Sequence, residues 1–356
     1  MRRRWIIVLG LVGVLLVGAG VGVYRYGAEY GWWARPTVHD APEAEPAEVE
    51  EYVSGLHLPF DLAFLPDGSA LVTERESFKL RMVSPDGELT DVRTIEDVAR
   101  EGADQAGLQG VAVSPTYEQD GWIYIYFTAE EGSRVARLKL DSTAPPETIL
   151  DGIPRGDIHN GGRIRFGPDG MLYVTTGEAG DKPRAQDRDD LGGKILRVTP
   201  DGDPAPGNPF EDSPVYAWGL RDPQGLAWDE DGQLYASEFG HNNLDELNRI
   251  EPGANYGWPE VEGQGGEPDY TDPVATWKPA DASPSGITYH DGQIWIACLR
   301  GERLYRINTD GSDAEQLLTN DYGRLRLVTE APDGSLWVLT NNHAGPDYDK
   351  ILRVTP

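Results

Sequence analysis

The chain contains a single cysteine among its 356 residues, which excludes an intrachain disulfide. That residue, Cys298, falls in the apolar run 294–299, so we predict a buried position in a strand. The body of the chain lacks the residue spacing of a zinc site, a phosphate-binding loop or a GxSxG nucleophile motif. Its glycine-rich turns are not followed by a βαβ unit, which argues against a dinucleotide-binding fold.

Basic residues are also few. The chain has 31 lysines and arginines against 60 aspartates and glutamates, giving a net charge of −29. A surface this acidic repels phosphate groups, which argues against a nucleic-acid partner. Only six of the basic residues are lysine. A dispersed acidic excess with so few lysines favours a halophilic protein, because salt near 1 M screens charges beyond about 3 Å. An ordinary acidic secreted protein is the alternative.

Charge is absent from Trp5 to Val23, a run long enough to span a bilayer. Three arginines precede it and predict a cytoplasmic N-terminus with the body outside the cell. We therefore expect residues 1–27 to form a single-pass transmembrane anchor helix in the cell membrane. A cleaved signal segment, which would leave a secreted protein, is the alternative. Residues 28–50 are rich in proline and acidic residues and predict a solvated linker.

Residues 51–356 repeat one phrase six times: an apolar residue, an Asp-Gly pair and an apolar strand. The pairs begin at positions 67, 120, 169, 231, 291 and 333. Asp-Gly between apolar runs predicts a hairpin, because glycine adopts positive φ without steric cost. Six such units, each long enough for several strands, predict an all-β, six-bladed β-propeller. A two-sheet sandwich is the alternative, but it does not explain the repeated spacing.

A second phrase alternates apolar and polar residues, which predicts a half-exposed outer strand. It occupies 80–87, 195–202, 304–311 and the terminal 351–356. Because the chain ends inside this phrase, a strand near Glu48–Leu56 is expected to pair with the last blade and close the ring.

Unusual loop sequences between the repeats are the expected place for a site, since a propeller gathers its loops at the end of its channel. His159 lies beside two glycines that allow close backbone approach. Glu178 ends the next strand, and a carboxylate can orient an imidazole and stabilise its charged form. Arg324 and Arg326 project to the same side of one strand pattern. A turn histidine and a salt-bridged outer strand are the structural alternatives.

These loops resemble those of the soluble, pyrroloquinoline quinone (PQQ)-dependent glucose/sorbosone or aldose dehydrogenases. The resemblance runs from about Gly55 to Pro356 and rests on HNGGR, LGGKILRVTPDG with NPF, GLRDPQG, and DEL with PGANYGWP. It implies oxidation of an aldose sugar to its lactone, with a hydride passing from sugar C1 to PQQ. Electrons would then pass to a membrane quinone or a soluble carrier.

The resemblance implies that His159 is the catalytic base and Glu178 its carboxylate partner, at a position where the family often has Asp. Gln105 matches a residue near the substrate. Arg221 matches a residue beside the quinone carbonyl, where a fixed cation stabilises charge developing on oxygen. Asn usually follows it in the family, whereas this chain has Asp222, a carboxylate that would partly cancel the cation at the cofactor.

The resemblance also implies a cradle for the three carboxylates of PQQ, formed by Arg300, Arg324 and Arg326. Arginine suits this role because it stays charged and binds bidentately. The family usually has Lys at the position of Arg300.

Calcium is the second implied cofactor, bridging PQQ to the main-chain carbonyls of Gly240 and His241. Carbonyl oxygens suit this hard cation. Residue 241 is usually Pro in the family. In some members a second, structural calcium corresponds to Glu246 and the Tyr256 carbonyl.

The other histidines, at positions 39, 57, 290 and 343, lie in the linker or in turns and are interpreted as structural or solvated. Two further functions stay open. One is a non-catalytic exported propeller that binds a protein or glycan, which the departures at Glu178, Asp222 and Arg300 favour. The other is a calcium-dependent lactonase, which would need side-chain ligands converging on one ion in the channel.

Overall fold

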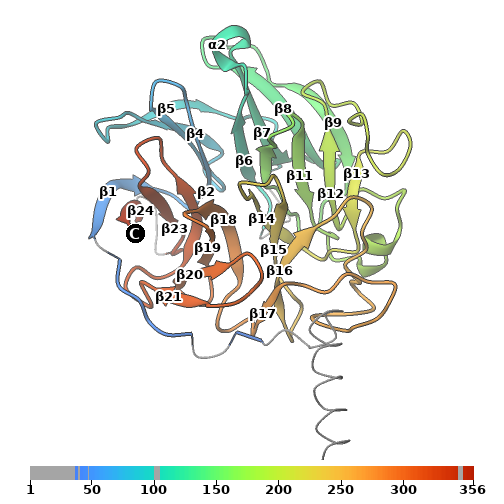
Figure 1. The fold of residues 1–356 in the computed structure, drawn as a ribbon. Helices are drawn as coiled ribbons and strands as arrows, with labels where there is room; N and C mark the ends of the chain where they lie inside the picture. Colours follow the sequence, from blue (N-terminus) through green and yellow to red (C-terminus); the bar gives the residue numbers. More distant parts are fainter. Residues whose placement is uncertain (1–36, 39–40, 47, 100–104, 344–347) are drawn as a thin grey trace, which may run out of the picture. The chain divides into compact units, whose positions relative to one another are not determined.

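Six four-stranded antiparallel sheets follow one another along the chain and surround a central axis as the blades of a β-propeller (Figure 1). The computed structural model describes residues 37–38, 41–46, 48–99, 105–343 and 348–356. The predicted six-bladed propeller is confirmed. The predicted anchor lies outside the described residues. Among the described residues, we find no helix with the length and apolar character needed to cross a membrane.

Five blades are built from four consecutive strands, and each blade contacts its neighbours through its first or second strand. Blades 1 to 3 consist of β2 (Pro59–Phe64), β3 (Ala70–Glu74), β4 (Lys79–Val83) and β5 (Leu89–Thr94); β6 (Leu108–Val113), β7 (Trp122–Thr128), β8 (Ser133–Lys139) and β9 (Glu147–Ile153); and β10 (Ile164–Phe166), β11 (Leu172–Thr176), β12 (Lys194–Val198) and β13 (Val215–Trp218). Blades 4 and 5 consist of β14 (Pro223–Trp228), β15 (Leu234–Glu238), β16 (Asp245–Ile250) and β17 (Ala275–Trp277); and β18 (Pro284–His290), β19 (Gln293–Cys298), β20 (Arg303–Asn308) and β21 (Glu315–Leu317). Blade 6 consists of β22 (Leu325–Glu330), β23 (Leu336–Thr340), β24 (Asp349–Thr355) and, at its outer edge, β1 (Glu48–Leu56). A short helix, α2 (Tyr117–Asp120), and a 3-10 turn, η1 (Lys182–Gln186), lie in the connections.

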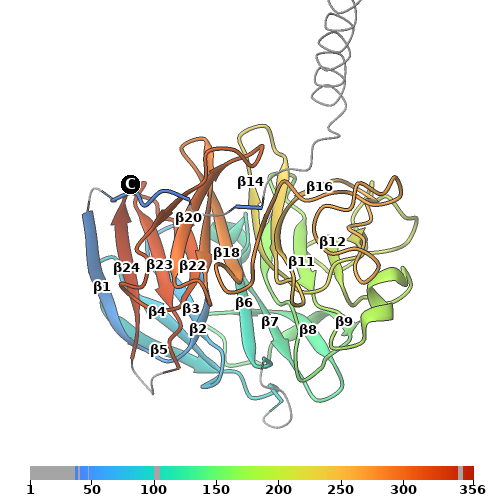
Figure 2. The same ribbon diagram turned by 90° about the horizontal axis from the view of Figure 1, so that it is seen from below.

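The ring closes as the sequence predicts, because β1 pairs antiparallel with β24 and so joins the two ends of the body in one blade. Each Asp-Gly pair lies in the turn between the first and second strands of a blade. The six glycines have φ between 68° and 85°, the left-handed conformation that a side chain disfavours. The Asp-Gly turns therefore all lie at one end of the ring, which Figure 2 shows from the side.

The second repeated phrase does not form the outer strands. It forms the third strand in four of the blades: β4, β12, β20 and β24. Its alternating burial is that of a strand with one covered face. Both the third and the fourth strand of a blade can have this pattern. The fourth strand has little sequence signature of its own, so the sequence pattern indicates the third strand as the outer edge of the blade.

The segment expected to be a solvated linker contacts the propeller from Thr37 onward. The Val38 amide donates to the Thr276 carbonyl at 2.7 Å, beside β17, and the Ala44 amide donates to the Gln316 carbonyl at 2.8 Å, beside β21. Ala41 is buried between these two points. In its described part this segment therefore extends the outer edges of blades 4 and 5.

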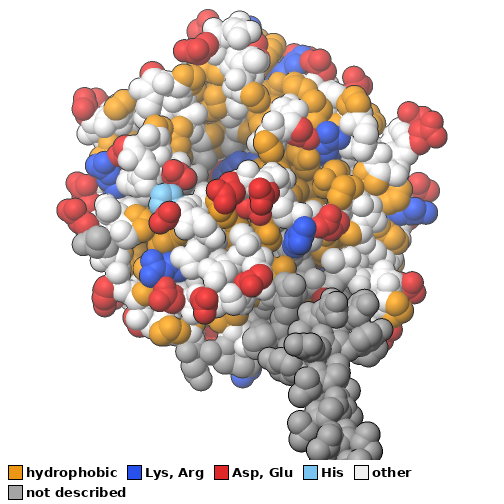
Figure 3. All heavy atoms as spheres, viewed as in Figure 1, with side chains coloured by type: hydrophobic (Ala, Val, Ile, Leu, Met, Phe, Trp, Pro, Cys, Tyr) orange, Lys and Arg blue, Asp and Glu red, His pale blue; other side chains and the backbone are white. Residues whose placement is uncertain are grey.

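The hydrophobic core is divided into six clusters, each between two neighbouring blades. Cys298 is fully buried in the cluster between blades 4 and 5, as predicted. Burying one large apolar side chain contributes about 1.5–3 kcal/mol, so the clusters hold each blade against the next. Aspartate and glutamate side chains are spread over the face drawn in Figure 3 rather than gathered in one patch.

Candidate functional site

A cavity of about 340 Å³ opens at the end of the ring opposite the Asp-Gly turns. Its lining residues lie in the connections between second and third strands and between successive blades, or in the strand ends that border these connections. Strands in a blade alternate in direction, so these two kinds of connection share one end. Five arginines line the cavity, together with one carboxylate and five side-chain amides: Arg75, Arg221, Arg300, Arg324, Arg326, Asp245, Gln105, Gln109, Asn160, Gln224 and Asn341.

His159 lies at the wall of this cavity in a left-handed conformation, with φ of 58°. Its amide donates to Gln105 Oε1 at 2.9 Å. Its ring Nδ1 is hydrogen-bonded to Glu178 Oε1, and its Nε2 lies 2.7 Å from Nη2 of Arg221. A guanidinium can only donate, so Nε2 is the acceptor of this hydrogen bond. The ring proton is therefore on Nδ1, which donates a hydrogen bond to Glu178. The base lone pair is therefore on Nε2.

Gly177 makes the close approach of these groups possible. A Cβ on this residue would lie 1.9 Å from the His159 carbonyl oxygen and 2.8 Å from Asp222 Oδ1. Glu178 follows directly, is almost fully buried, and its amide donates to the Arg221 carbonyl at 2.8 Å. His159 and Glu178, predicted as a histidine–carboxylate pair, are thus in contact. The backbone of Arg221 holds Glu178 in place.

Arg221 spans the cavity wall between His159 and the loop after β15. Its Nη1 donates to the carbonyls of Phe239, at 3.0 Å, and Gly240, at 2.6 Å. Its amide is bound by the Glu238 carboxylate. The Trp258 ring lies 5.5 Å from the guanidinium carbon. Arg221 is thus held in place, while its buried Nε has no partner among the described residues.

Asp222 does not line the cavity, contrary to its expected place at the cofactor. It is 1% exposed, and its Oδ1 accepts the Gly161 amide at 3.0 Å, two residues beyond His159. Burial raises the pKa of this carboxyl. Its charge acts on the site from behind the wall rather than inside the cavity.

Arg324 and Arg326 line the cavity from the start of β22, the innermost strand of blade 6. The alternative of a salt-bridged outer strand is therefore wrong. No described carboxylate forms an ion pair with either residue or with Arg300, and the buried Nε atoms of Arg324 and Arg326 have no partner. Such unpaired buried donors are costly, so this wall is complementary to an anionic ligand.

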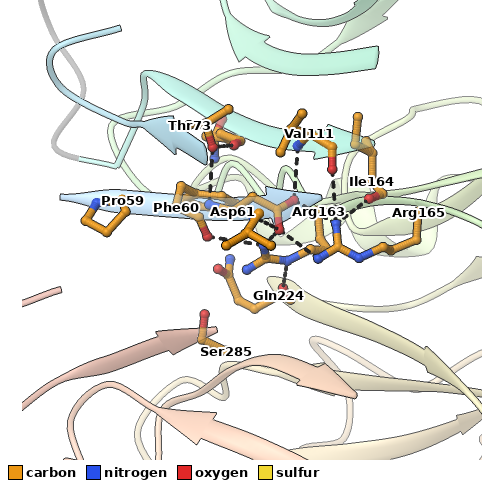
Figure 4. Close-up of polar contacts among 12 residues, drawn as sticks. Pro59, Phe60, Asp61, Thr73, Val111, Arg163, Ile164, Arg165, Gln224 and Ser285 are labelled. Carbon is orange, nitrogen blue, oxygen red and sulfur yellow. Dashed lines mark hydrogen bonds and ion pairs between the residues drawn. The ribbon is translucent and has the colours of Figure 1, made fainter. Parts of the chain in front are cut away.

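Phe60 forms a platform beneath this wall. The guanidinium of Arg326 lies 4.0 Å from the ring centroid and that of Arg163 lies 4.8 Å from it. Behind the ring, Asp61 is fully buried between Arg163 and Arg165, which it contacts at 2.5 and 2.7 Å (Figure 4). Burial opposes ionisation of Asp61, but the two arginines outweigh it and lower its pKa.

Gly240 and His241 both line the cavity. Glu262 holds their loop by accepting the amides of His241, at 2.6 Å, and Asn243, at 3.2 Å. The Gly240 carbonyl points to Arg221, so a cation at this oxygen would have to share it with a guanidinium. The oxygen suits calcium only if a bound anion draws Arg221 away or offsets its charge.

Glu246 and Tyr256 are not part of the cavity lining. Glu246 is buried on β16, where it accepts the Gly263 amide at 2.6 Å, and burial raises its pKa to about 7. The Tyr256 hydroxyl donates to the Arg249 carbonyl at 2.7 Å. In the described ranges, no three His, Cys, Asp or Glu side chains are grouped so that they could hold a metal ion.

Sequence reasoning missed several lining residues. His343 was interpreted as structural or solvated but lies in the wall, where burial and the cations Arg75 and Arg324 lower its pKa. Arg75, Gln109 and Asn341 also face the cavity. The sequence marks these residues only by their position close to a strand end, on the side of the ring where the cavity opens.

These features define the class of protein: a β-propeller with an arginine-rich cavity around a histidine–carboxylate pair. The family model for glucose/sorbosone dehydrogenase matches residues 56–353, and the chain belongs to this family. The resemblance inferred from the loops is confirmed.

The chain is similar to sugar dehydrogenases of three bacteria. It shares 47% identity with the PQQ-bound aldose sugar dehydrogenase of Streptomyces coelicolor, over 88% of this chain and 99% of that one, with a TM-score of 0.82. It is 28% identical to the aldose sugar dehydrogenase of Escherichia coli, over 91% and 95% of the two chains. It is 29% identical to quinoprotein glucose dehydrogenase B of Acinetobacter calcoaceticus, over 64% and 55%.

Proposed function

We propose that this protein oxidises an aldose sugar to its lactone with PQQ as cofactor. One observation carries the proposal: the unprotonated Nε2 of His159, which accepts a hydrogen bond from Arg221, lies in a cavity lined by five arginines and a single carboxylate. The PQQ-bound relative from Streptomyces coelicolor supports the choice of cofactor. PQQ, when bound, supplies a two-electron acceptor for the hydride that leaves C1 of the sugar.

His159 takes the proton of the sugar C1 hydroxyl on Nε2. Glu178, bonded to Nδ1, keeps the ring in the tautomer that leaves Nε2 free and stabilises the imidazolium that forms. Gln105 binds the His159 amide and lines the same wall, within reach of a sugar hydroxyl. Arg221 offers a fixed positive charge where negative charge develops on an oxygen.

Arg300, Arg324 and Arg326 would hold the carboxylates of PQQ. Their charges have no ion-pair partner among the described residues, so a trianionic ligand would neutralise them. Calcium would be held by the Gly240 and His241 carbonyls together with the ligand's own oxygens. Because the Gly240 oxygen is bonded to Arg221, we expect calcium to bind with PQQ rather than before it.

The protein's setting is a further part of the proposal. We infer a body outside the cell, anchored by residues 1–27, with electrons passing to a membrane quinone or a soluble carrier. The run Trp5–Val23 and the arginines before it support the anchor. The net charge of −29 supports a salty medium.

The test is a titration of the full chain with PQQ and calcium in high salt, following dye reduction across a panel of aldoses. We expect saturable turnover that requires both additions, and none in His159→Ala. PQQ binding that persists in His159→Ala would show that the variant keeps its cavity. A folded wild-type protein that binds no PQQ would reject the proposal and leave a non-catalytic binding module as the better account.

A further inference from the structure

Asp222 is a buried carboxyl with one oxygen used and one oxygen free. Oδ1 accepts the amide of Gly161 at 3.0 Å. Oδ2 is buried and accepts no hydrogen bond of normal geometry from the described residues, and the nearby Gln224 side chain favours its charge. A carboxyl serving only to fasten a turn would not need a second, unsatisfied oxygen, because an asparagine accepts the same amide without a charge.

The oxygen that is used lies against the turn that carries His159. Gly161 is two residues beyond it, and a Cβ on Gly177 would meet both the His159 carbonyl, at 1.9 Å, and Asp222 Oδ1, at 2.8 Å. Three segments therefore converge on one point: the turn at 159–161, the end of β11 and the start of β14. Asp222 joins the first of these to the third.

Charged and titratable groups face Asp222 from every side. His159 and Arg221 are the two groups whose positive charge most favours ionisation of Asp222. The charge of Asp222 also acts on Arg326 in the cavity wall, on Glu238 at the end of β15 and on the hydroxyl of Tyr126. An anion among these groups favours a positive charge on the imidazole and opposes the buried carboxylate Glu238.

We propose that Asp222 is a positioning residue for His159, fastening its turn through Gly161 and supplying a buried negative charge that stabilises the imidazolium formed during proton transfer. The proposal rests on the proposed function, in which His159 is the base. It differs from the expectation drawn from sequence, in which the carboxylate weakens Arg221 at the cofactor.

Burial raises the pKa of Asp222, so its charge is lost as the pH falls toward the acidic range. The acid limb of turnover then reflects two groups, since proton uptake by Asp222 weakens the base that it supports. Wild type is expected to lose kcat on this limb more steeply than a single titration allows.

The decisive variant is Asp222→Asn, in the full chain, with Asp189→Asn as a control that removes one exposed charge. Asparagine keeps an acceptor for the Gly161 amide and is the residue that the resembling family usually carries here, so the variant is expected to fold. We expect kcat to fall roughly tenfold, the effect of one pKa unit of lost charge stabilisation. Its acid limb is expected to follow a single titration, and its affinity for PQQ to stay within about twofold.

A second readout needs no cofactor. The imidazole of His159 can be followed by NMR in the protein without PQQ, and we expect its ring signals to differ from those of wild type in Asp222→Asn but not in Asp189→Asn. Identical ring signals and identical acid limbs would overturn the proposal and leave Asp222 a structural residue. A rise in kcat with tighter PQQ binding would overturn it too, because the carboxylate would then be opposing Arg221. Absence of turnover in wild type, with the NMR shift present, would reject the proposed function alone.

Discussion

The Nε2 atom of His159 lies 2.7 Å from Nη2 of Arg221. A cation held against the basic nitrogen fixes which nitrogen is free of its proton, and Glu178 fixes the other. The arrangement orders the imidazole before substrate arrives. It also means that a proton taken up on Nε2 must displace Arg221 from this contact.

Removing the charge of Glu178 tests the tautomer. In Glu178→Gln the amide can present its NH₂ group to Nδ1, which moves the proton to Nε2 and removes the base. We expect kcat to fall by about 10²–10⁴, the usual contribution of general-base catalysis, with PQQ affinity unchanged. Glu178→Asp keeps a carboxylate and is the control. Equal activity in both variants would show that the charge at this position is not needed.

The aromatic platform under Arg326 can be removed without changing charge. Phe60→Leu loses a ring lying 4.0 Å from the guanidinium. A buried cation–π contact contributes about 1–2 kcal/mol, so we expect PQQ to bind roughly 5- to 30-fold more weakly in a direct binding titration. Phe64→Leu, in the same strand but packed on Trp337, is the control and should bind as wild type does. Equal binding by both variants would remove Phe60 from the cofactor site.

Asp61 anchors the floor of the channel. In Asp61→Asn the buried Arg163 and the half-buried Arg165 lose their counter-charge, so we expect the free energy of unfolding to fall by about 3–5 kcal/mol. The pKa of Asp61 is lowered on folding, so its contribution is present above the usual aspartate range and is lost as the pH falls below it. Wild type should thus approach the variant in strongly acidic buffer. Denaturation of both proteins across pH checks this; a constant difference would contradict it.

Gly177 allows the convergence of three segments behind His159. In Gly177→Ala the added Cβ would lie 1.9 Å from the His159 carbonyl, so the turn must shift. We expect turnover to fall by more than tenfold, since small misplacement of a catalytic group is costly. Gly170→Ala is the control, because no atom lies within 4 Å of a Cβ there, although its φ of 74° costs about 1 kcal/mol. Similar activity in both variants would show that the turn tolerates displacement.

The sequence predicted the fold because each blade repeats a turn that only glycine enters freely. The predicted closure of the ring is confirmed, because β1 pairs with β24. The outer strands were misplaced, since edge strands such as β17 and β21 are only three residues long and carry no repeat.

The site was harder to predict than the fold. His159 and the arginine pair stand in recognisable loops, whereas Arg75 and His343 are single residues brought to the wall by ring closure. Asp222 shows the other limit. Its neighbours along the chain suggest that it faces the cofactor, but its conformation turns it to the Gly161 amide.

The most direct test of the central claim is single turnover of PQQ-loaded protein with an aldose carrying deuterium at C1. If His159 removes the hydroxyl proton while the C1 hydrogen leaves as hydride, cofactor reduction is several-fold slower with the deuterated sugar and yields the lactone. An equal rate with both sugars, or reduction without lactone, would contradict the account.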